Sequence, residues 1–278
     1  MNQLSIPEKY YNFRLGIADF TISVNCSHYQ LAENLAARYT CFPPGKSTHF
    51  HARIDWVGTE RNSSLLDTKS NFKKGILHFS ASGYQGYIDE KAGYGYLRLS
   101  SVQPVEDIDY YLRVALALLV HDADCILMHT AGIARNGQSY LFFGHSGSGK
   151  TTICRVSANM GSKDNLTILN DDLILLERQE EKWVAHGTPF WNPTQIEPSN
   201  QCAPIAAMYY LIQDKEVYKR KLTQGMAIAA LLSNVPVIPQ DSLRSIHLVD
   251  RLTQFFRFTP VYELHFLPNN SFWNVIQD

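Results

Sequence analysis

The sequence predicts a mixed α/β protein with two domains, and three observations lead to this prediction. Residues 1–103 consist mainly of short segments in which apolar and polar residues alternate, as they do in half-buried β-strands. From Pro104 onward, strand-like and helix-like segments alternate, which is typical of an α/β domain. A glycine-rich stretch at 144–152 lies between an apolar strand-like segment and a helix-like one. We therefore expect a β-rich N-terminal domain over 1–103 that serves as a scaffold or contacts a substrate, and an α/β domain over 104–278.

Composition supports a globular protein with a sizeable core. The chain has 278 residues, of which 45% are hydrophobic and 18% charged, and this is a comfortable length for two domains. A formal net charge of −1 gives no reason to expect nucleic acid or an anionic membrane as a partner. No uninterrupted apolar stretch approaches the roughly 20 residues that a membrane span requires.

The cysteines and the first residues predict a cytoplasmic protein. The five cysteines are scattered and form no C-x-x-C pair, a spacing that suits reduced thiols rather than zinc or a disulfide framework. The first nine residues contain neither a basic start nor an apolar core, so we expect no secretory signal there.

In the N-terminal part, alternation predicts four strands and one helix. The strands are expected at 20–24, 49–57, 75–80 and 93–99, and a short helix is expected at 30–38.

In the C-terminal part, Pro104 and the acidic residues after it mark the start of a largely buried helix. Strands are expected at 126–129, 140–143, 166–169 and 173–177, and a helix is expected from Thr151 onward.

Residues 144–152 match the phosphate-loop pattern G-x-x-x-x-G-K-[ST]. Glycines allow the tight turns that direct consecutive N–H groups and a helix N-terminus at phosphate oxygens. Lys150 is expected to reach the β- and γ-phosphates of a nucleotide, and the Thr151 hydroxyl to ligate Mg²⁺. The expected nucleotide-binding residues are Gly144, His145, Ser146, Gly147, Ser148, Gly149, Lys150, Thr151 and Thr152.

Two adjacent carboxylates, Asp171 and Asp172, directly follow a strand-like segment. Such a position brings a carboxylate to a loop-bound Mg²⁺, and the second carboxylate can then accept a proton from an attacking hydroxyl. The alternative is a solvent-exposed turn between two strands. Because the pair follows a phosphate-loop pattern, we favour the functional interpretation.

His129 ends a predicted strand whose successor leads directly into the loop. A histidine at this place can stabilise charge on a terminal phosphate or carry a proton. A buried, hydrogen-bonded histidine is an equally good interpretation of the residue alone.

Taken together, His129-Thr130-Ala131-Gly132, the loop 144–151 and Asp171-Asp172 resemble the catalytic domain of HPr kinase/phosphorylase, whose core is related to that of phosphoenolpyruvate carboxykinase. The resemblance covers about residues 105–278. It is strongest to a looser group of HPr-kinase-like proteins, some of them encoded in lasso-peptide pathways, which phosphorylate a serine of a precursor peptide. That group shares segments similar to 129–135, Gly187-Thr188-Pro189 and 260–264.

This resemblance implies a kinase that transfers the γ-phosphoryl group of ATP to a hydroxyl, with a serine of a peptide or small protein as the acceptor. Lys150 and the loop amides would hold the phosphates, and Thr151 and Asp172 the Mg²⁺. Asp171 would be the base, and His129 would lie beside the transferred group. Hexamers occur in the related family, so a homo-oligomer is among the expected states.

The sequence departs from the family in two places. Residues 184–187 contain neither the acid nor the arginine of the family's Glu-Ile-Arg-Gly segment, so a second metal ligand and the phosphorylase reaction stay open questions. The N-terminal part does not resemble that of true HPr kinases, so HPr is not the expected substrate. Two alternatives stay open: a kinase of a free small molecule, such as an amino acid or sugar, and a non-catalytic module that senses a nucleotide and binds a peptide.

Overall fold

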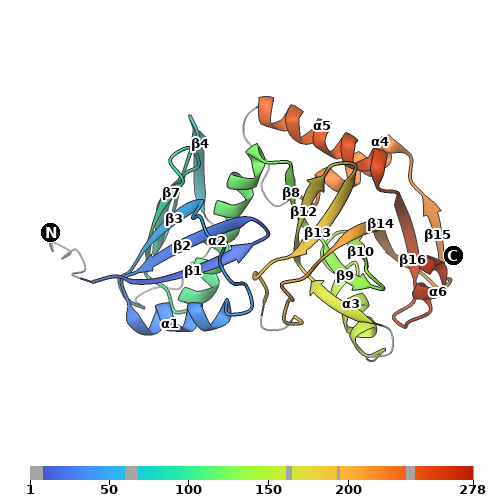
Figure 1. Cartoon of the computed structure of the whole chain (residues 1–278), viewed down its shortest axis with the longest axis horizontal. Helices are drawn as coiled ribbons and strands as arrows, with labels where there is room; N and C mark the ends of the chain where they lie inside the picture. Colours follow the sequence, from blue (N-terminus) through green and yellow to red (C-terminus); the bar gives the residue numbers. More distant parts are fainter. Residues whose placement is uncertain (1–8, 60–67, 161–164, 193–194, 236–241, 278) are drawn as a thin grey trace. The chain divides into compact units, whose positions relative to one another are not determined.

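The structure is a computed structural model that describes residues 9–59, 68–160, 165–192, 195–235 and 242–277. Its fold is mixed α/β, as predicted, and the chain forms two compact units, Met1–Leu119 and Val120–Asp278 (Figure 1). The two units are described separately below.

The first unit is built on one mixed sheet. In spatial order its strands are β1 (Tyr11–Ile17), β2 (Phe20–Cys26), β3 (Phe50–Trp56), β7 (Tyr94–Leu99), β6 (Tyr84–Asp89), β5 (Ile76–Ala81) and β4 (Lys69–Lys73). Strand β3 runs parallel to both of its neighbours, and the remaining pairs are antiparallel. Helix α1 (Tyr29–Arg38) is the crossover between the parallel strands β2 and β3. The strands and the helix expected in this part of the sequence are therefore present.

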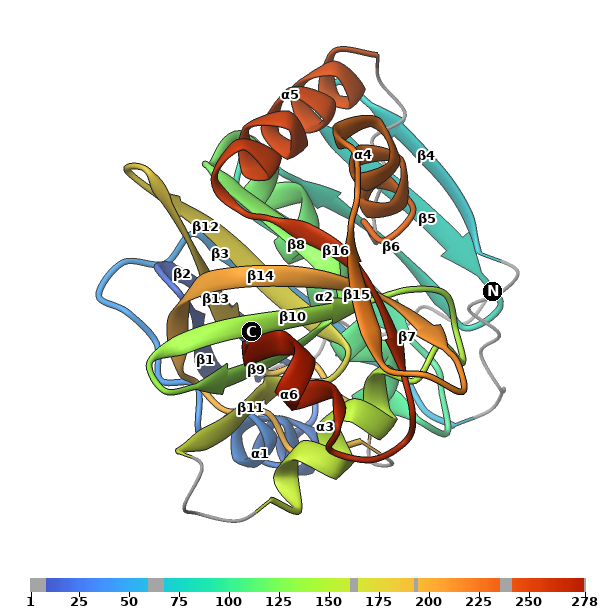
Figure 2. The same ribbon diagram turned by 90° about the vertical axis from the view of Figure 1, so that its right-hand side faces the viewer.

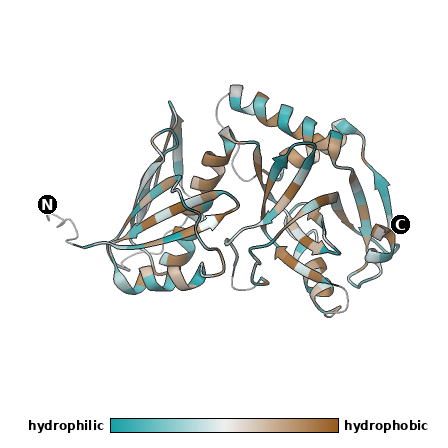
Figure 3. Cartoon of the chain, in the orientation of Figure 1, coloured by the Kyte–Doolittle hydropathy of each residue, from teal (hydrophilic) through white to brown (hydrophobic). Residues whose placement is uncertain are grey.

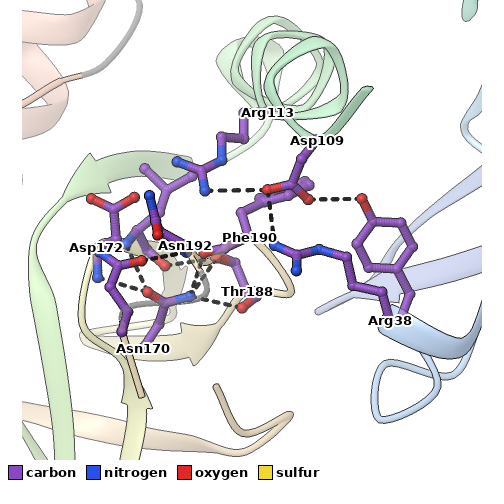
Figure 4. Close-up of polar contacts among 11 residues, drawn as sticks. Arg38, Asp109, Arg113, Asn170, Asp172, Thr188, Phe190 and Asn192 are labelled. Carbon is purple, nitrogen blue, oxygen red and sulfur yellow. Dashed lines mark hydrogen bonds and ion pairs between the residues drawn. The ribbon is translucent and has the colours of Figure 1, made fainter. Parts of the chain in front are cut away.

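Helix α2 (Pro104–Leu119) belongs to this first unit, whereas the sequence places the domain boundary before it. The reason lies in its contacts with residues far away in the chain. The Tyr111 hydroxyl donates a hydrogen bond to the carbonyl of Tyr87 in β6, at 3.3 Å. The buried Asp109 carboxylate accepts a hydrogen bond from the Tyr39 hydroxyl at 2.7 Å and pairs with Arg38 at 3.4 Å and with Arg113 at 3.2 Å (Figure 4). Local sequence pattern shows where a helix begins, but not which sheet it packs against.

The second unit contains a sheet in which one long strand pairs with different strands along its length. Its main path runs through β11 (Leu166–Asn170), β9 (Ala131–Arg135), β10 (Gln138–Phe143), β14 (Cys202–Gln213), β13 (Lys182–Gly187), β12 (Leu173–Gln179) and β8 (Cys125–His129). Strand β16 (Val261–Phe266) pairs with β14, and β15 (Tyr218–Lys221) pairs with β16. The beginning of β14 pairs with β13, and its later part runs parallel to β10 and β16.

Helices and one short turn complete the second unit. They are the 3₁₀ turn Val120–Asp122, α3 (Lys150–Ala158), α4 (Gln224–Leu232), α5 (Ser242–Phe258) and α6 (Phe272–Gln277). Helices α4 and α5 lie side by side, and residues of both share a hydrophobic cluster with β8, β12 and β13 (Figure 2). A second cluster joins α3 and α6 to β9, β10 and β14. In Figure 3 hydrophobic residues follow the strands between these helices, as expected for a sheet with two buried faces. In the described part of the chain, no helix combines the length and the apolar character that a membrane crossing needs.

Four strands of this unit, β9, β13, β14 and β15, were not expected, and β9 bears directly on the site. From the sequence we expected the strand that ends at His129 to be followed directly by the strand before the loop. In the structure, β9 lies between them in the chain. In addition, β8 pairs with β12, far along the sheet from β10. The position of His129 therefore depends on its pairing with β12 and not on its nearness to the loop in sequence.

Gly187, at the end of β13, gives a direct test of this packing. A Cβ atom there would lie 2.0 Å from the carbonyl oxygen of Ser199 and 2.7 Å from that of Leu169, and backbone atoms cannot turn aside as a flexible side chain can. Gly187→Ala should lower the free energy of unfolding by about 2–4 kcal/mol, measured by urea denaturation. Gly225→Ala is the matched control, because a Cβ on that helical residue meets open space and should leave stability unchanged or raise it by up to about 1 kcal/mol. Equal stabilities of the two variants would contradict the prediction.

Candidate functional site

The glycine-rich stretch forms a loop between β10, which ends at Phe143, and α3, which begins at Lys150. Three of its glycines have positive φ angles: Gly144 at 152°, Gly147 at 79° and Gly149 at 108°. L-residues with a side chain rarely adopt these angles, so the loop needs glycine at these places. The order of strand, loop and helix is the one that the sequence predicts.

The first turn of α3 offers backbone N–H groups that the helix does not use. Gly149 occupies the N-cap position without a side-chain cap, and the first hydrogen bond of the helix runs from the Ile153 N–H to the Gly149 carbonyl at 2.9 Å. The amides of Lys150, Thr151 and Thr152 therefore precede the helical hydrogen bonds, as at any helix start. Together with the helix dipole, such groups attract anions.

Lys150 is folded back over the loop. Its side chain is buried, and Nζ donates hydrogen bonds to the carbonyl oxygens of Gly144 at 3.0 Å and His145 at 3.5 Å. Burial lowers the pKa of Lys150, whereas the nearby charges of Asp172 and Asp171 raise it. The ammonium group, the loop and both acids are thus close enough to interact electrostatically.

The backbone turn that carries the two acids is held by Asn170, which the sequence analysis does not single out. Asn170 is fully buried, and its Oδ1 accepts hydrogen bonds from the N–H groups of Asp172 at 2.7 Å and Leu173 at 3.0 Å (Figure 4). Its Nδ2 donates to the carbonyl oxygens of Thr188 and Phe190, both at 2.9 Å. Asparagine commonly caps a turn in this way, so an Asn directly before the acid pair was the available signal.

Asp171 points into the interior. Only 1% of the residue is exposed, and among the described residues neither carboxylate oxygen receives a well-formed hydrogen bond. Burial, and secondarily the charge of Asp172, raise its pKa from 3.8 to about 6, although the Thr151 side chain, the Ile196 backbone and Arg155 act in the opposite direction. A carboxyl group with such a pKa is ionised at neutral pH and able to accept a proton. Asp171 is therefore not the exposed turn residue of the alternative interpretation.

His129 and Asp172 meet because of strand pairing. In the antiparallel pair of β8 and β12, His129 lies opposite Leu173, the residue after Asp172. The His129 Nε2 lies 3.4 Å from the Asp172 Oδ1, and 45% of the imidazole side chain is exposed. His129 is thus neither buried nor remote, and its ring reaches the same turn as the two acids.

The structure thus brings together the predicted catalytic residues His129, Lys150, Asp171 and Asp172. Among the predicted loop residues, Gly144, Ser148 and Lys150 are buried, Gly149, Thr151 and Thr152 are partly exposed, and His145, Ser146 and Gly147 are exposed. Ser148 also has a buried Oγ without a partner in the described structure.

The donor set suits a magnesium ion held partly by a ligand. Within the described residues, no group of three or more His, Cys, Asp or Glu side chains is arranged to hold a metal. Mg²⁺ is commonly bound by one or two carboxylates together with substrate phosphates and water. The hydroxyl of Thr151 acts on the buried carboxylate of Asp171, and Asp172 is close enough to act on both Asp171 and Lys150, so these oxygens fit an ion of that kind.

The comparisons with known proteins find similarity among solved structures. No protein-family model matches the chain, and no curated protein matches it. Among solved structures, the HPr(Ser) kinase/phosphatase from Coxiella burnetii aligns with 54% of this chain and 93% of its own, with 8% sequence identity and a TM-score of 0.31. A similarity this low does not decide activity, and the function has to be inferred from the site itself.

Replacing Asn170 tests its role in holding the acid pair. Asn170→Ala removes the acceptor of two backbone N–H groups and the donor to two carbonyls, all of them buried. We expect a loss of about 2–4 kcal/mol in the free energy of unfolding, measured by urea denaturation. Asn269→Ala is the control, because Asn269 is exposed and its side chain accepts hydrogen bonds from Ser271 in its own turn. A loss no larger than that of the control would show that Asn170 is not essential to the turn.

The raised pKa of Asp171 predicts a dependence of stability on pH. Between pH 3.8 and about 6 the folded protein holds this proton more tightly than the unfolded chain, so the contribution of Asp171 to stability falls as the pH rises through this range. Above pH 6 the ionised group costs up to about 3 kcal/mol, at 1.36 kcal/mol per pKa unit. Asp171→Asn should therefore be more stable than the wild type at pH 7.5, and the difference should shrink below pH 6. Urea titrations at several pH values measure it, and a difference independent of pH would contradict the assignment.

Proposed function

We propose that the protein is a kinase that transfers the γ-phosphoryl group of a nucleoside triphosphate, with ATP as the expected donor, to a hydroxyl group. The observation that carries the proposal is the buried Asp171 carboxylate, whose pKa is raised to about 6 and whose oxygens lack well-formed hydrogen bonds in the described structure. Burying such a carboxylate lowers the stability of the fold, and raised carboxyl pKa values are common in active sites that need a base. Here the group adjoins a glycine loop with its lysine.

In this proposal the loop holds the phosphates. The amides at the start of α3 and the Lys150 ammonium bind the oxygens of the β- and γ-phosphates. Because Lys150 is already held over the loop by the carbonyls of Gly144 and His145, little side-chain freedom is lost when a phosphate binds.

Asp171 is the proposed base. It accepts the proton of the acceptor hydroxyl while the hydroxyl oxygen forms a bond to the γ-phosphorus, and the bond from that phosphorus to the bridging oxygen breaks with its electron pair leaving on the nucleoside diphosphate. Thr151 and Asp172 are the residues proposed to hold Mg²⁺, which when bound neutralises charge on the phosphate oxygens. His129, paired with Asp172, orients that carboxylate and adds positive charge near the transferred group when protonated.

The acceptor is proposed as a serine of a peptide or small protein, on the basis of the sequence resemblance described above. A kinase of a small molecule uses the same loop and acids, so the acceptor has to be found by experiment. A nucleotide sensor without catalysis would require neither a buried, perturbed carboxylate nor a histidine beside its neighbour. The site geometry therefore favours a transferase over a sensor.

Two substitutions separate chemistry from nucleotide binding. Asp171→Asn should reduce phosphoryl transfer from ATP at least 100-fold, because loss of a general base typically costs about 10²- to 10⁴-fold, while a fluorescent ATP analogue still binds. Lys150→Ala should weaken binding of the analogue itself, because it removes the cation of the loop. Transfer is measured with γ-labelled ATP and a library of serine-containing peptides, and with water as acceptor.

Asp250→Asn is the control for these assays, since Asp250 is exposed on α5 and its carboxylate accepts a hydrogen bond from Gln254 of the same helix. It should leave both binding and transfer unchanged. Transfer that persists in Asp171→Asn would remove Asp171 from the role of base. If the wild type consumed no ATP with any acceptor, the sensor would replace the kinase.

A further inference from the structure

A cavity borders the glycine loop on a side that the proposed chemistry does not use. Its volume is about 490 Å³, within the range of small-molecule sites. The residues that line it come from three places, namely the loop and α3, the end of β14, and the end of β16: Gly149, Thr152, Gln213, Asp214, Lys215, Phe266 and Pro268. His129, Lys150, Asp171 and Asp172 are not among them.

The cavity and the acids adjoin different residues at the start of α3. Thr151 acts on Asp171, whereas Thr152, the next residue of the helix, lines the cavity. Consecutive side chains of a helix point about 100° apart, so the side chains of the two threonines point in different directions from the same helix turn. A triphosphate whose terminal phosphate lies at the acids has its nucleoside at the opposite end of its phosphate chain. The cavity borders the loop, and neither acid lines it.

The walls of the cavity are formed by paired strands and are joined to the loop. Gln213 and Phe266 are partners in the parallel pair of β14 and β16, and the Asp214 N–H continues the pairing to the Phe266 carbonyl at 3.1 Å. The Gln213 Nε2 donates a hydrogen bond to the carbonyl of Gly147 at 2.8 Å. The Phe266 ring lies so close to Gly149 that a Cβ there would approach it to 2.6 Å. Two residues that line the cavity, Gln213 and Phe266, therefore contact the loop, at Gly147 and at Gly149.

The lining offers groups that suit a base and a ribose. Phe266 and Pro268 are apolar, and the amide oxygen of Gln213 can accept a hydrogen bond. The Asp214 Oδ2 accepts a hydrogen bond from His265 Nδ1 at 2.7 Å, and Oδ1 accepts one from the Lys215 N–H at 2.6 Å. Each carboxylate oxygen has a second lone pair, which can accept from a ribose hydroxyl or an exocyclic amino group. The His265 contact lowers the pKa of Asp214, so the group is an ionised acceptor at neutral pH.

From this arrangement we infer that the cavity between the loop, Gln213–Lys215 and Pro268 binds the nucleoside of the donor nucleotide, with Asp214 as the acceptor for its polar hydrogens. The inference rests on the proposed function, because it needs the triphosphate to lie on the loop. It adds the residues that distinguish a nucleotide from a bare polyphosphate.

Binding of inorganic tripolyphosphate and of ATP, measured by calorimetry, tests the inference. Wild-type protein should bind ATP at least tenfold more tightly than tripolyphosphate, which has no nucleoside. Asp214→Ala should weaken ATP binding about tenfold, as for loss of a hydrogen bond to a charged group, and should change tripolyphosphate binding less than twofold. Glu216→Ala is the matched control: it removes the same charge from an exposed neighbour that does not line the cavity, and it should alter neither affinity. GTP in the same assay shows which base the cavity prefers.

The outcomes separate the two proposals. If ATP binds no more tightly than tripolyphosphate, or if Asp214→Ala weakens both ligands equally, the cavity does not bind the nucleoside, while the loop remains a phosphate site. If the wild type binds neither ligand, the proposed kinase function fails and the nucleoside site fails with it. Thermal unfolding of each variant checks that it is folded, which is expected because Asp214 and Glu216 are exposed.

Discussion

The candidate site depends on one buried side chain, that of Asn170. Its amide joins the turn that carries the two acids to the segment from Thr188 to Phe190, which directly follows β13, the antiparallel partner of β12. Thr188 completes the connection, because its hydroxyl donates a hydrogen bond to the carbonyl of Leu173 at 2.7 Å. With the backbone held on both sides, Asp171 is directed inward and Asp172 is left beside His129. A network that is fully hydrogen-bonded can keep a carboxylate in a place where water would otherwise solvate it.

In the same turn, a residue that stabilises the fold lies next to one whose burial costs stability. Asn170 has partners for both ends of its amide, whereas Asp171 is buried without well-formed ones among the described residues. The first arrangement stabilises the fold, and the second costs free energy that the surrounding structure has to offset. An unsatisfied buried group in an otherwise satisfied turn is characteristic of a functional position, where the missing partner belongs to a ligand or substrate. The proposed kinase reaction supplies that partner as the proton of an acceptor hydroxyl.

The glycine loop is close to two different groups of residues. On the side of Thr151 it adjoins charged groups, and on the side of Thr152 it adjoins the ends of β14 and β16. Strand β14 lies between the elements on these two sides, since it pairs with β13 near its start and with β10 and β16 further along. The β10 partner leads into the loop, and the β16 partner contributes Phe266 to the cavity beside it. A single long strand therefore joins the strand that leads into the loop to the strand that contributes to the cavity.

The sequence by itself determined the features that are local. The glycines at 144, 147 and 149 predict a loop with positive φ angles, which the structure has. The strand before them and the helix after them are predicted by patterns of a few residues. About half of the strands and helices were predicted for the same reason, as was the mixed α/β fold. Tertiary structure alone decided that His129 meets Asp172, because the contact arises from the pairing of β8 with β12. It also decided that α2 packs in the first unit and that Asp171 is buried, since burial and pairing join residues that are far apart in the chain and leave no signal in the residues between them.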